Sequence, residues 1–392
     1  MKIGLITTLN TNIGDDFIRE GLCTVLKQLW GDSDLQLVPV NKHHPLSLYP
    51  DNHPLVRMRR LAVGGYRRQL AIRQLSRVFR RVGSTRFDDC DAIVQCGAPV
   101  YWLHCGKETA WRQDLWHDVV GRLYRRIPVF NLAAGSCFPV KRQPETFEDP
   151  EDRKYVRWLH HVCRATTVRD PLALKLLASL GCDAELIRCS AFLFTSPAEA
   201  APREDGPVLF NYMDGGGHYD WGQNVDKNRW ERTAQQAVAT LRKTHRVAML
   251  CHNEKEKSCA EISFPGIECL LPSSFREFPA MVRHAKAAIC NRMHASVALA
   301  GMGIPAVTVG TDTRLLMVEQ LGLPCYFAEE VDAATLVADV ERLIRDRKSI
   351  ADELAVRREE TRAAYERVLR QHFNPAEAPR SSRSRLAKSH AE

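Results

Sequence analysis

The sequence predicts an α/β fold with two Rossmann-like domains that face each other across a cleft. Short apolar segments alternate with amphipathic segments along the whole chain of 392 residues. This alternation is typical of parallel sheets with helices on both faces. A stretch rich in Pro, Ala and charged residues, 195–207, divides the apolar segments into two series. Each series therefore predicts one sheet.

The predicted strands are short runs in which apolar residues predominate. In the N-terminal series they are 2–7, 34–40, 91–95, 128–133, 165–168 and 184–187, and in the C-terminal series 207–212, 246–251, 266–271, 287–290, 305–309 and 324–327. The amphipathic stretches between them predict helices, among them 15–29, 171–180, 228–243 and 295–302. We expect an N-terminal domain over 1–195 and a C-terminal domain over 206–373.

The C-terminal part of the chain changes character after the last predicted strand. Residues 332–373 predict two helices, with Ser349 and Asp352 as a capping box at the start of the second. We expect this pair to pack across the domains or to extend the second one. Residues 374–392 consist mainly of Pro, Ser, Ala and charged residues, with little to bury, and predict a disordered tail.

The positive charge of the chain is concentrated in one segment. The net charge is +8, and residues 52–87 contain ten arginines and no acidic residue. A local excess of this kind argues against a general nucleic-acid partner. Within 57–86 the apolar residues Leu75, Val78, Phe79 and Val82 follow helical spacing, which predicts a basic amphipathic helix of the N-terminal domain. Either this helix makes a peripheral contact with an anionic membrane, or it is an ordinary helix with solvated charges.

Cysteine and histidine spacing gives no metal motif. The thirteen cysteines form no Cys-x-x-Cys pair, and the fourteen histidines form no i, i+4 pair. The start of the chain is too short and too mixed in character for a signal peptide. We therefore expect reduced cysteines in a cytoplasmic protein with no bound metal. The oligomeric state stays open.

Candidate site residues follow the predicted strands of the N-terminal series, because ligands of open α/β sheets bind beyond the carboxyl ends of the strands. After the first strand, Asn12, Gly14 and Asp15 lead into a helix that Asp15 is placed to cap, and its N-terminus offers N–H groups to an anion. A simple capped turn is the alternative interpretation.

Three further N-terminal loops carry candidates for substrate binding. Gly97 and Gly135 follow the third and fourth strands, where a backbone must come close to another group. Arg169 ends the fifth strand at the expected mouth of the cleft, before an aspartate that caps the next helix. Its planar guanidinium suits a carboxylate or phosphate, although a surface ion pair would explain it too.

The C-terminal series offers two loops with histidines. Asp214 and His218 flank a run of three glycines after the first strand, which forms either a loop that closes on a substrate or a flexible linker. His252 follows the second strand and would face the cleft.

The most specific pattern is Arg-x-His at a strand-to-helix switch. Arg292 and His294 follow a buried strand and precede a helix of small residues. The guanidinium, the imidazole and the helix N-terminus would converge on one point, which suits a doubly charged phosphate with His294 as general acid. Arg314, after the next strand, is a further cation for the cleft.

These motifs resemble the polysaccharide pyruvyltransferase family. The similar segments are Asn12-Ile13-Gly14-Asp15, Gly135-Ser136, Val168-Arg169-Asp170, and Arg292-Met293-His294 leading to Gly303-Ile304-Pro305. Their order and spacing over residues 1–327 carry the resemblance. It implies a glycosyltransferase-B-like fold, in which Arg169, Arg292 and His294 hold phosphoenolpyruvate.

The chain also departs from the pattern of that family. Members commonly have a Gly-Gly-Gly run at Cys96-Gly97-Ala98, a Pro-Asp-Pro-Ala-like turn at Arg188-Cys189-Ser190-Ala191, and often a lysine at position 314. The residues for the donor phosphate are kept. The departures therefore bear on the acceptor and on the activity itself.

The resemblance implies a transferase that moves the pyruvyl group of phosphoenolpyruvate onto hydroxyls of a saccharide in polysaccharide or exopolysaccharide biosynthesis. The product is a pyruvate ketal, and no cofactor is needed besides the donor substrate. His294 is the candidate acid, and Asp15, Asp214, His218 and His252 are candidate bases. If the acceptor is lipid-linked, the enzyme would work at the inner face of the membrane.

Two other interpretations fit the sequence. One is a glycosyltransferase or sugar-nucleotide epimerase on the same architecture, which needs a nucleotide pocket in the second domain. The other is a degenerate family member that binds a saccharide or a partner without catalysis, and the altered turns at Gly97 and Cys189 motivate it.

Overall fold

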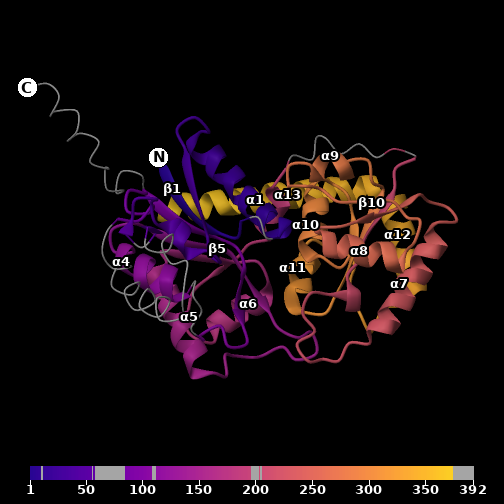
Figure 1. The fold of residues 1–392 in the computed structure, drawn as a ribbon, viewed down its shortest axis with the longest axis horizontal. Helices are drawn as coiled ribbons and strands as arrows, with labels where there is room; N and C mark the ends of the chain where they lie inside the picture. The colour runs from indigo at the N-terminus through magenta and orange to yellow at the C-terminus, as the bar shows by residue number, and fades with distance from the viewer. Residues whose placement is uncertain are drawn as a thin grey trace, which may run out of the picture.

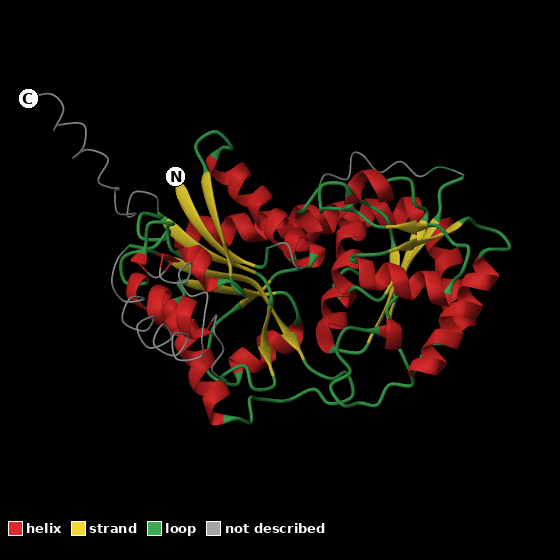
Figure 2. Ribbon diagram, viewed as in Figure 1, coloured by secondary structure: helices red, strands yellow, loops and turns green. Residues whose placement is uncertain are grey.

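Two parallel sheets surrounded by helices form the structure (Figure 1, Figure 2). The computed structural model describes residues 1–9, 12–54, 56–57, 84–107, 112–195, 203 and 205–373. The predicted basic helix over 57–86 and the predicted tail over 374–392 therefore lie outside the described residues, except for Arg57 and 84–86.

The first sheet belongs to the N-terminal half of the chain. Its strands are β1 (Lys2–Thr7), β2 (Gln36–Asn41), β3 (Ala92–Cys96), β4 (Pro99–Trp102), β5 (Val129–Cys137), β6 (Ala165–Val168) and β7 (Glu185–Leu186). They pair in parallel in the order β2-β1-β3-β5-β6-β7, and β4 pairs with β5. The sequence did not predict β4, because this short strand follows β3 after only two residues and resembles a loop.

The second sheet belongs to the C-terminal half. Its strands are β8 (Val208–Asn211), β9 (Val247–Leu250), β10 (Cys269–Leu270), β11 (Ala287–Cys290), β12 (Ala306–Gly310) and β13 (Cys325–Phe327). They are parallel, in the order β10-β9-β8-β11-β12-β13, which is the strand order of dinucleotide-binding Rossmann sheets. The order reverses between β8 and β11, so the loops after these two strands lie at the switch point. The predicted α/β fold with two parallel sheets is confirmed.

Helices connect the strands in both halves (Figure 2). The N-terminal half contains α1 (Ile13–Trp30), η1 (Pro45–Leu48), the π-helical η2 (Arg112–Val120), α4 (Gly121–Leu123), α5 (Pro150–Val162), α6 (Pro171–Ala178) and η3 (Ser190–Leu193). The C-terminal half contains η5 (Asp214–Gly216), α7 (Lys227–Leu241), α8 (Glu254–Ser263), α9 (Phe278–Val282), α10 (Met293–Gly301), η6 (Thr313–Leu315), α11 (Leu316–Glu319), α12 (Ala333–Arg345) and α13 (Arg347–His372).

Helix capping corrects two expectations. Asn12, and not Asp15, caps α1, because its Oδ1 accepts a hydrogen bond from the N–H of Gly14 at 3.1 Å. The predicted capping box at Ser349 is wrong, because α13 already begins at Arg347. The first polar residue after α12 is Asp346, where the two helices meet, and Ser349 lies inside the second helix.

The last helix runs from the C-terminal half across to the first sheet, as the yellow ribbon in Figure 1 shows. The hydroxyl of Tyr365 donates to the carbonyl of Arg188 at 3.0 Å, and the Arg188 guanidinium pairs with Glu360 at 3.1 Å. The ring of Phe373 meets the ring of Phe130 edge-on at 6.1 Å. The expectation that this part packs across the two halves is therefore correct. Among the described helices, none has the length and apolar character that crossing a membrane requires.

The two halves also share one hydrophobic core, in which η3 lies between α1 and α10. A Cβ atom on Gly21 of α1 would lie 1.7 Å from the carbonyl oxygen of Ser190, and one on Gly301 of α10 would lie 2.3 Å from that of Phe192. Both clashes are with backbone, which has little freedom to move. Because these glycines have no side chains, both α1 and α10 can pack closely against the backbone of η3.

We predict that Gly21→Ala and Gly301→Ala each lower the free energy of unfolding by about 3 kcal/mol or more, since overpacking against backbone exceeds the usual cost of an added methylene. Denaturant unfolding followed by circular dichroism checks this. Thr24→Ala, on the same helix as Gly21 and half-buried, should change the stability by about 1 kcal/mol or less. Unchanged unfolding of both glycine variants would contradict the close approach.

Candidate active site

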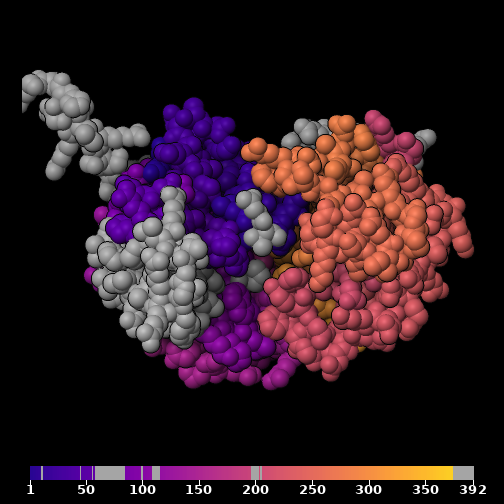
Figure 3. All heavy atoms as spheres, viewed as in Figure 1, coloured from indigo at the N-terminus to yellow at the C-terminus, as the bar shows by residue number. Residues whose placement is uncertain are grey.

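The two halves are hydrogen-bonded to each other beside the site. The backbone N–H of Thr313 donates to the carbonyl of Phe138 at 2.8 Å, and the N–H of Phe138 donates to the Thr313 hydroxyl at 3.0 Å. The Thr313 hydroxyl also lies 3.1 Å from the hydroxyl of Ser136, which donates to Asp170 at 2.7 Å. These bonds join the loops after β5 and β12. In Figure 3 the surface is hollowed where the two halves meet.

A cavity of about 360 Å³ lies between the halves and is lined by half of the predicted site residues. Its walls combine cations, imidazoles and aromatic rings. The N-terminal half contributes Asn12, Asp15, Lys42, His43, Trp102 and Cys137, and the C-terminal half contributes His218, Tyr219, Trp221, Arg292, His294 and Arg314. The sequence did not identify Lys42 or His43, which follow β2 in a loop without a glycine or an Arg-x-His pattern. It also missed Trp102, which ends the unpredicted strand β4, and Trp221, which follows the three-glycine run.

The N-termini of α1 and α10 meet at this cavity. Every residue of α10 is buried, and Arg292 is its N-cap residue. A Cβ atom on Gly14, in the first turn of α1, would lie 3.1 Å from Nδ1 of His294. Because the N-terminal end of a helix carries a partial positive charge, this arrangement favours an anion beside His294.

Arg169 forms a hydrogen bond with the imidazole of His294. It is fully buried and does not line this cavity, and its Nη1 lies 3.0 Å from Nε2 of His294. The expected position at the mouth of the cleft is therefore wrong: the end of β6 is covered by α10. A guanidinium only donates hydrogen bonds, so Nε2 accepts and the neutral imidazole carries its proton on Nδ1.

The protonation state of His294 follows from this environment. Burial, and next the charge of Arg169, hold the pKa of His294 well below its usual range. The imidazole is thus neutral near pH 7, and the Nδ1–H on the Gly14 side is its hydrogen-bond donor.

Arg292 is held by a carboxylate that the sequence did not reveal. Its Nε donates to Oε1 of Glu256 at 2.8 Å, and Nη2 pairs with the same oxygen. Burial by itself raises the pKa of Glu256, but Arg292 and the adjacent donors outweigh it and the pKa is lowered overall. Glu256 also donates its N–H to Oδ1 of Asn253 at 2.9 Å. This Asn-x-x-Glu pattern is typical of a helix start and conceals the second role of the glutamate.

Arg314 is also paired. Its Nε and Nη2 donate to the two carboxylate oxygens of buried Asp312 at 2.8 and 2.7 Å. The guanidinium lies 5.0 Å from the centre of the Tyr219 ring, a cation–π distance. Two fixed guanidinium groups, Arg292 and Arg314, therefore flank His294.

The pKa values of His218, His252 and Lys42, which lie in or beside the cavity, are lowered, and this favours the neutral form of each group. Burial, followed by the charges of Arg292 and Arg314, lowers the pKa of His218 to about 4. Burial also lowers the pKa of His252 to about 4 and lowers the pKa of Lys42, which Asp15 partly opposes. Each of these groups lies where an approaching anion would favour its protonated form.

A second cavity of about 640 Å³ adjoins the first and shares His218 and Arg292 with it. Asp214 lines this second cavity and pairs with Lys227 at 2.9 Å. The structure therefore separates Asp214 from His294, although the sequence placed both in one site.

The two candidate glycines of the N-terminal half have packing roles. A Cβ atom on Gly97 would lie 2.5 Å from Cγ2 of Ile18, and one on Gly135 would lie 2.4 Å from Nε of Arg169. Neither glycine lines the cavities described here. Gly135 still serves the site, because it makes room for the guanidinium that contacts His294.

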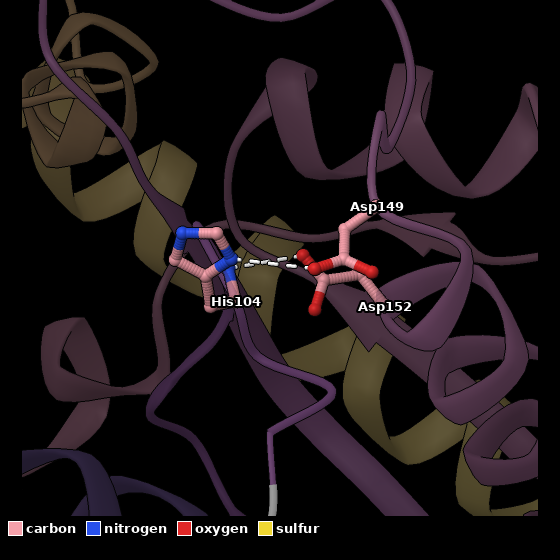
Figure 4. Close-up of side chains that lie close together, drawn as sticks. All are labelled: His104, Asp149 and Asp152. Atoms are coloured by element: carbon pink, nitrogen blue, oxygen red, sulfur yellow. Dashed lines mark hydrogen bonds and ion pairs between the residues drawn. The ribbon is translucent and has the colours of Figure 1, made fainter.

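A separate cluster of His104, Asp149 and Asp152 has the composition of a metal site (Figure 4). Asp152 accepts hydrogen bonds from the backbone N–H groups of His104 and Gly106, at 3.0 and 2.6 Å. Asp149 caps α5 through the N–H of Glu151 and also contacts Nδ1 of His104. These bonds fasten the loop after β4 to α5, which accounts for the cluster without an ion.

Comparisons with known proteins identify the fold and the family of the chain. The fold is shared with S. aureus MnaA, solved with UDP, at 13% identity over 90% of each chain and a TM-score of 0.51. Acinetobacter baumannii MurG is similar over 94% of this chain and 99% of its own, at 9% identity and a TM-score of 0.41. Comparison with individually curated proteins gives no match.

The fold thus defines a glycosyltransferase-B-like protein with its site between two Rossmann-like sheets. The profile of the family described as Polysaccharide pyruvyl transferase matches residues 12–313, which include Asn12, Arg169, Arg292 and His294. The chain belongs to the polysaccharide pyruvyl transferase family, as the resemblance of its motifs indicated.

We predict that acid destabilises the protein through the buried histidines. The folded-state pKa values of His218 and His252 are about 4, below the ordinary value of 6.5, so their stabilising contribution is complete above pH 6.5 and is lost as the pH falls toward 4. Each group that binds a proton only in the unfolded state costs about 1.4 kcal/mol per pH unit.

Thermal unfolding between pH 7 and pH 5 measures this effect. His252→Phe should give a shallower loss of stability with falling pH, and the exposed His104→Gln should follow the wild type. An identical pH slope for His252→Phe and the wild type would contradict the neutral state of His252.

Proposed function

We propose that the protein transfers the pyruvyl group of phosphoenolpyruvate to hydroxyl groups of a saccharide and forms a pyruvate ketal. The observation that carries this proposal is the convergence of Arg292, Arg314 and the neutral His294 at the N-termini of α1 and α10. Membership of the pyruvyl transferase family supports it.

The donor site suits a small molecule with several negative charges. Phosphoenolpyruvate carries a phosphate and a carboxylate, and each is a good partner for a fixed guanidinium. Arg292 and Arg314 flank the cavity, and the Nδ1–H of His294 adds a donor between them. Arg169 then acts as a positioning residue, since it holds His294 and adds positive charge without lining the cavity.

The reaction needs one proton at carbon and one leaving group. A proton is added to the methylene carbon while an acceptor hydroxyl bonds to the neighbouring carbon and releases its own proton to a base. The bond from that carbon to the phosphate oxygen then breaks, and phosphate leaves with the electron pair. A second hydroxyl bonds to the same carbon and closes the ketal, and its proton passes to the leaving phosphate, which becomes hydrogen phosphate. Asp15 and His218 line the same cavity as His294 and are the nearest candidates for the base.

The aromatic rings in the cavity wall support a saccharide as acceptor. Trp102, Tyr219 and Trp221 line the cavity, and amphipathic rings of this kind combine an apolar face with a polar edge. If the acceptor is lipid-linked, the arginine-rich segment provides the membrane contact. Co-sedimentation with anionic vesicles at low and moderate salt tests that contact, with neutral vesicles as the control.

We predict that phosphoenolpyruvate binds the wild type and that Arg292→Ala weakens binding by at least about 30-fold. A charged hydrogen bond is worth about 2 kcal/mol, and Glu256 would be left facing the ligand. Isothermal titration calorimetry measures both affinities. Arg126→Ala, which removes an exposed arginine paired with Asp88, should bind like the wild type.

The same titration distinguishes the alternatives. Binding of UDP-N-acetylglucosamine without binding of phosphoenolpyruvate would overturn the proposal in favour of a nucleotide-sugar enzyme. Binding of phosphoenolpyruvate with no phosphate release across a panel of methyl hexosides and oligosaccharides would favour a binding protein without catalysis.

A further inference from the structure

His252 carries a buried imidazole that no described residue satisfies. It follows β9, and both its ring nitrogens are shielded from solvent without a hydrogen-bond partner among the described residues. The ring meets the rings of Phe17 and Phe278 edge-on, at 6.2 and 6.3 Å. An unsatisfied buried polar group costs on the order of 1–3 kcal/mol, so its presence calls for a ligand or a function.

The surroundings of His252 belong to the candidate donor site. The imidazole lines a small cavity together with Asn12, Gly14, His218, Asn291, Arg292, Met293, His294 and Arg314. The small cavity has a volume of only about 10 Å³, which is room for about one water. Five of its residues also line the cavity of about 360 Å³, so the small cavity is the inner end of that larger one. An anion held by Arg292 at the N-terminus of α10 would therefore lie beside His252.

His252 is better placed than His294 to become an imidazolium. Nε2 of His294 already accepts from Arg169, and a proton there would set two donors against each other. The nitrogens of His252 face no such donor, and its own backbone N–H donates to Oε2 of Glu256 at 2.9 Å, which brings a carboxylate next to it.

The charges around His252 determine its protonation. Arg292 and Arg314 face it from the loops after β11 and β12, His218 from the loop after β8, His294 from α10, and Glu256 from α8. The rings on α1 and α9 are uncharged. Burial, together with Arg292, lowers the pKa to about 4 in the absence of a ligand, and Glu256 opposes them.

We propose that His252 takes up a proton when a phosphate dianion, either a phosphate ester or free phosphate, binds in the cavity of about 360 Å³ beside this inner end, and that the imidazolium stabilises the bound ligand. This inference rests on the proposed function for the identity of the ligand, phosphoenolpyruvate. The dianion neutralises the cations that disfavour the imidazolium and adds a charge that favours it. Holding the proton at pH 7 needs a rise of about three pKa units, a roughly thousandfold change in proton affinity.

Calorimetry in two buffers of different ionisation enthalpy measures the proton uptake directly. At pH 7 the phosphate of phosphoenolpyruvate is already mostly a dianion, since its second pKa is about 6. We expect the wild type to take up about half a proton or more per bound phosphoenolpyruvate, because a pKa raised to about 7 leaves half of the imidazole protonated. His252→Phe should bind more weakly and take up close to none. Phenylalanine suits the aromatic surroundings, and His104→Gln is the control that should match the wild type.

The outcomes separate this inference from the proposed function. Binding of phosphoenolpyruvate without proton uptake, or equal uptake in His252→Phe, would overturn the inference and leave the function standing. If phosphoenolpyruvate does not bind the folded wild type, the proposed function fails, and the same titration with inorganic phosphate decides the inference. Absence of phosphate binding, or binding without proton uptake, would then overturn it.

Nuclear magnetic resonance gives a second measurement on the wild type alone. With ¹⁵N-labelled histidine, the His252 resonances are those missing from His252→Phe, or from His252→Gln if the first variant does not fold. Addition of phosphoenolpyruvate at pH 7 should move them from neutral imidazole to imidazolium positions. Resonances that stay at neutral positions in the saturated complex would refute the proposal.

Discussion

The hydrogen bond between Arg169 and His294 requires both halves of the chain to be packed in one arrangement. The arginine ends β6 of the first sheet, and the histidine begins α10 beside the second sheet. The bridge between Phe138 and Thr313 and the shared core around η3 maintain that arrangement. A hinge that separated the halves would leave a buried guanidinium without its partner, at a cost of several kcal/mol.

Burial of positive charge is the second constraint, and the structure meets it with dedicated carboxylates. Glu256 accompanies Arg292, and Asp312 accompanies Arg314, so each of the two guanidinium groups that line the cavity has one acidic partner outside it. Arg169 is different, because Nε and Nη2 have no hydrogen-bond partner among the described residues. After burial, its charge is the next largest cause of the lowered pKa that keeps His294 neutral. The same field attracts a polyanion and disfavours imidazolium groups until that polyanion arrives.

The sequence predicted the sheets well because their signals are local. Each predicted strand is an apolar run that a parallel sheet buries, and the Arg-x-His switch falls at the point where the strand order reverses between β8 and β11. The features that escaped prediction depend on long-range contacts. In the sequence, Glu256 resembles an ordinary residue at the start of a helix. Only the fold brings it into contact with Arg292, thirty-six positions later. The burial of Arg169 depends on α10 covering the end of β6, which no local pattern encodes.

The arrangement of the histidines bears on how one site can both bind a polyanion and handle protons. His294 is locked in one tautomer by Arg169, so it is suited to donate a constant hydrogen bond. His252 has unused nitrogens and a nearby carboxylate, so its charge is free to follow that of the ligand. A site with only a histidine like His294 would bind a polyanion but could not exchange a proton with it. A site with only a histidine like His252 would have no histidine in a fixed tautomer to hold its hydrogen bonds constant when the charge changes. Separating the two roles between α10 and β9 allows the positions of the cations to stay fixed while a proton enters and leaves.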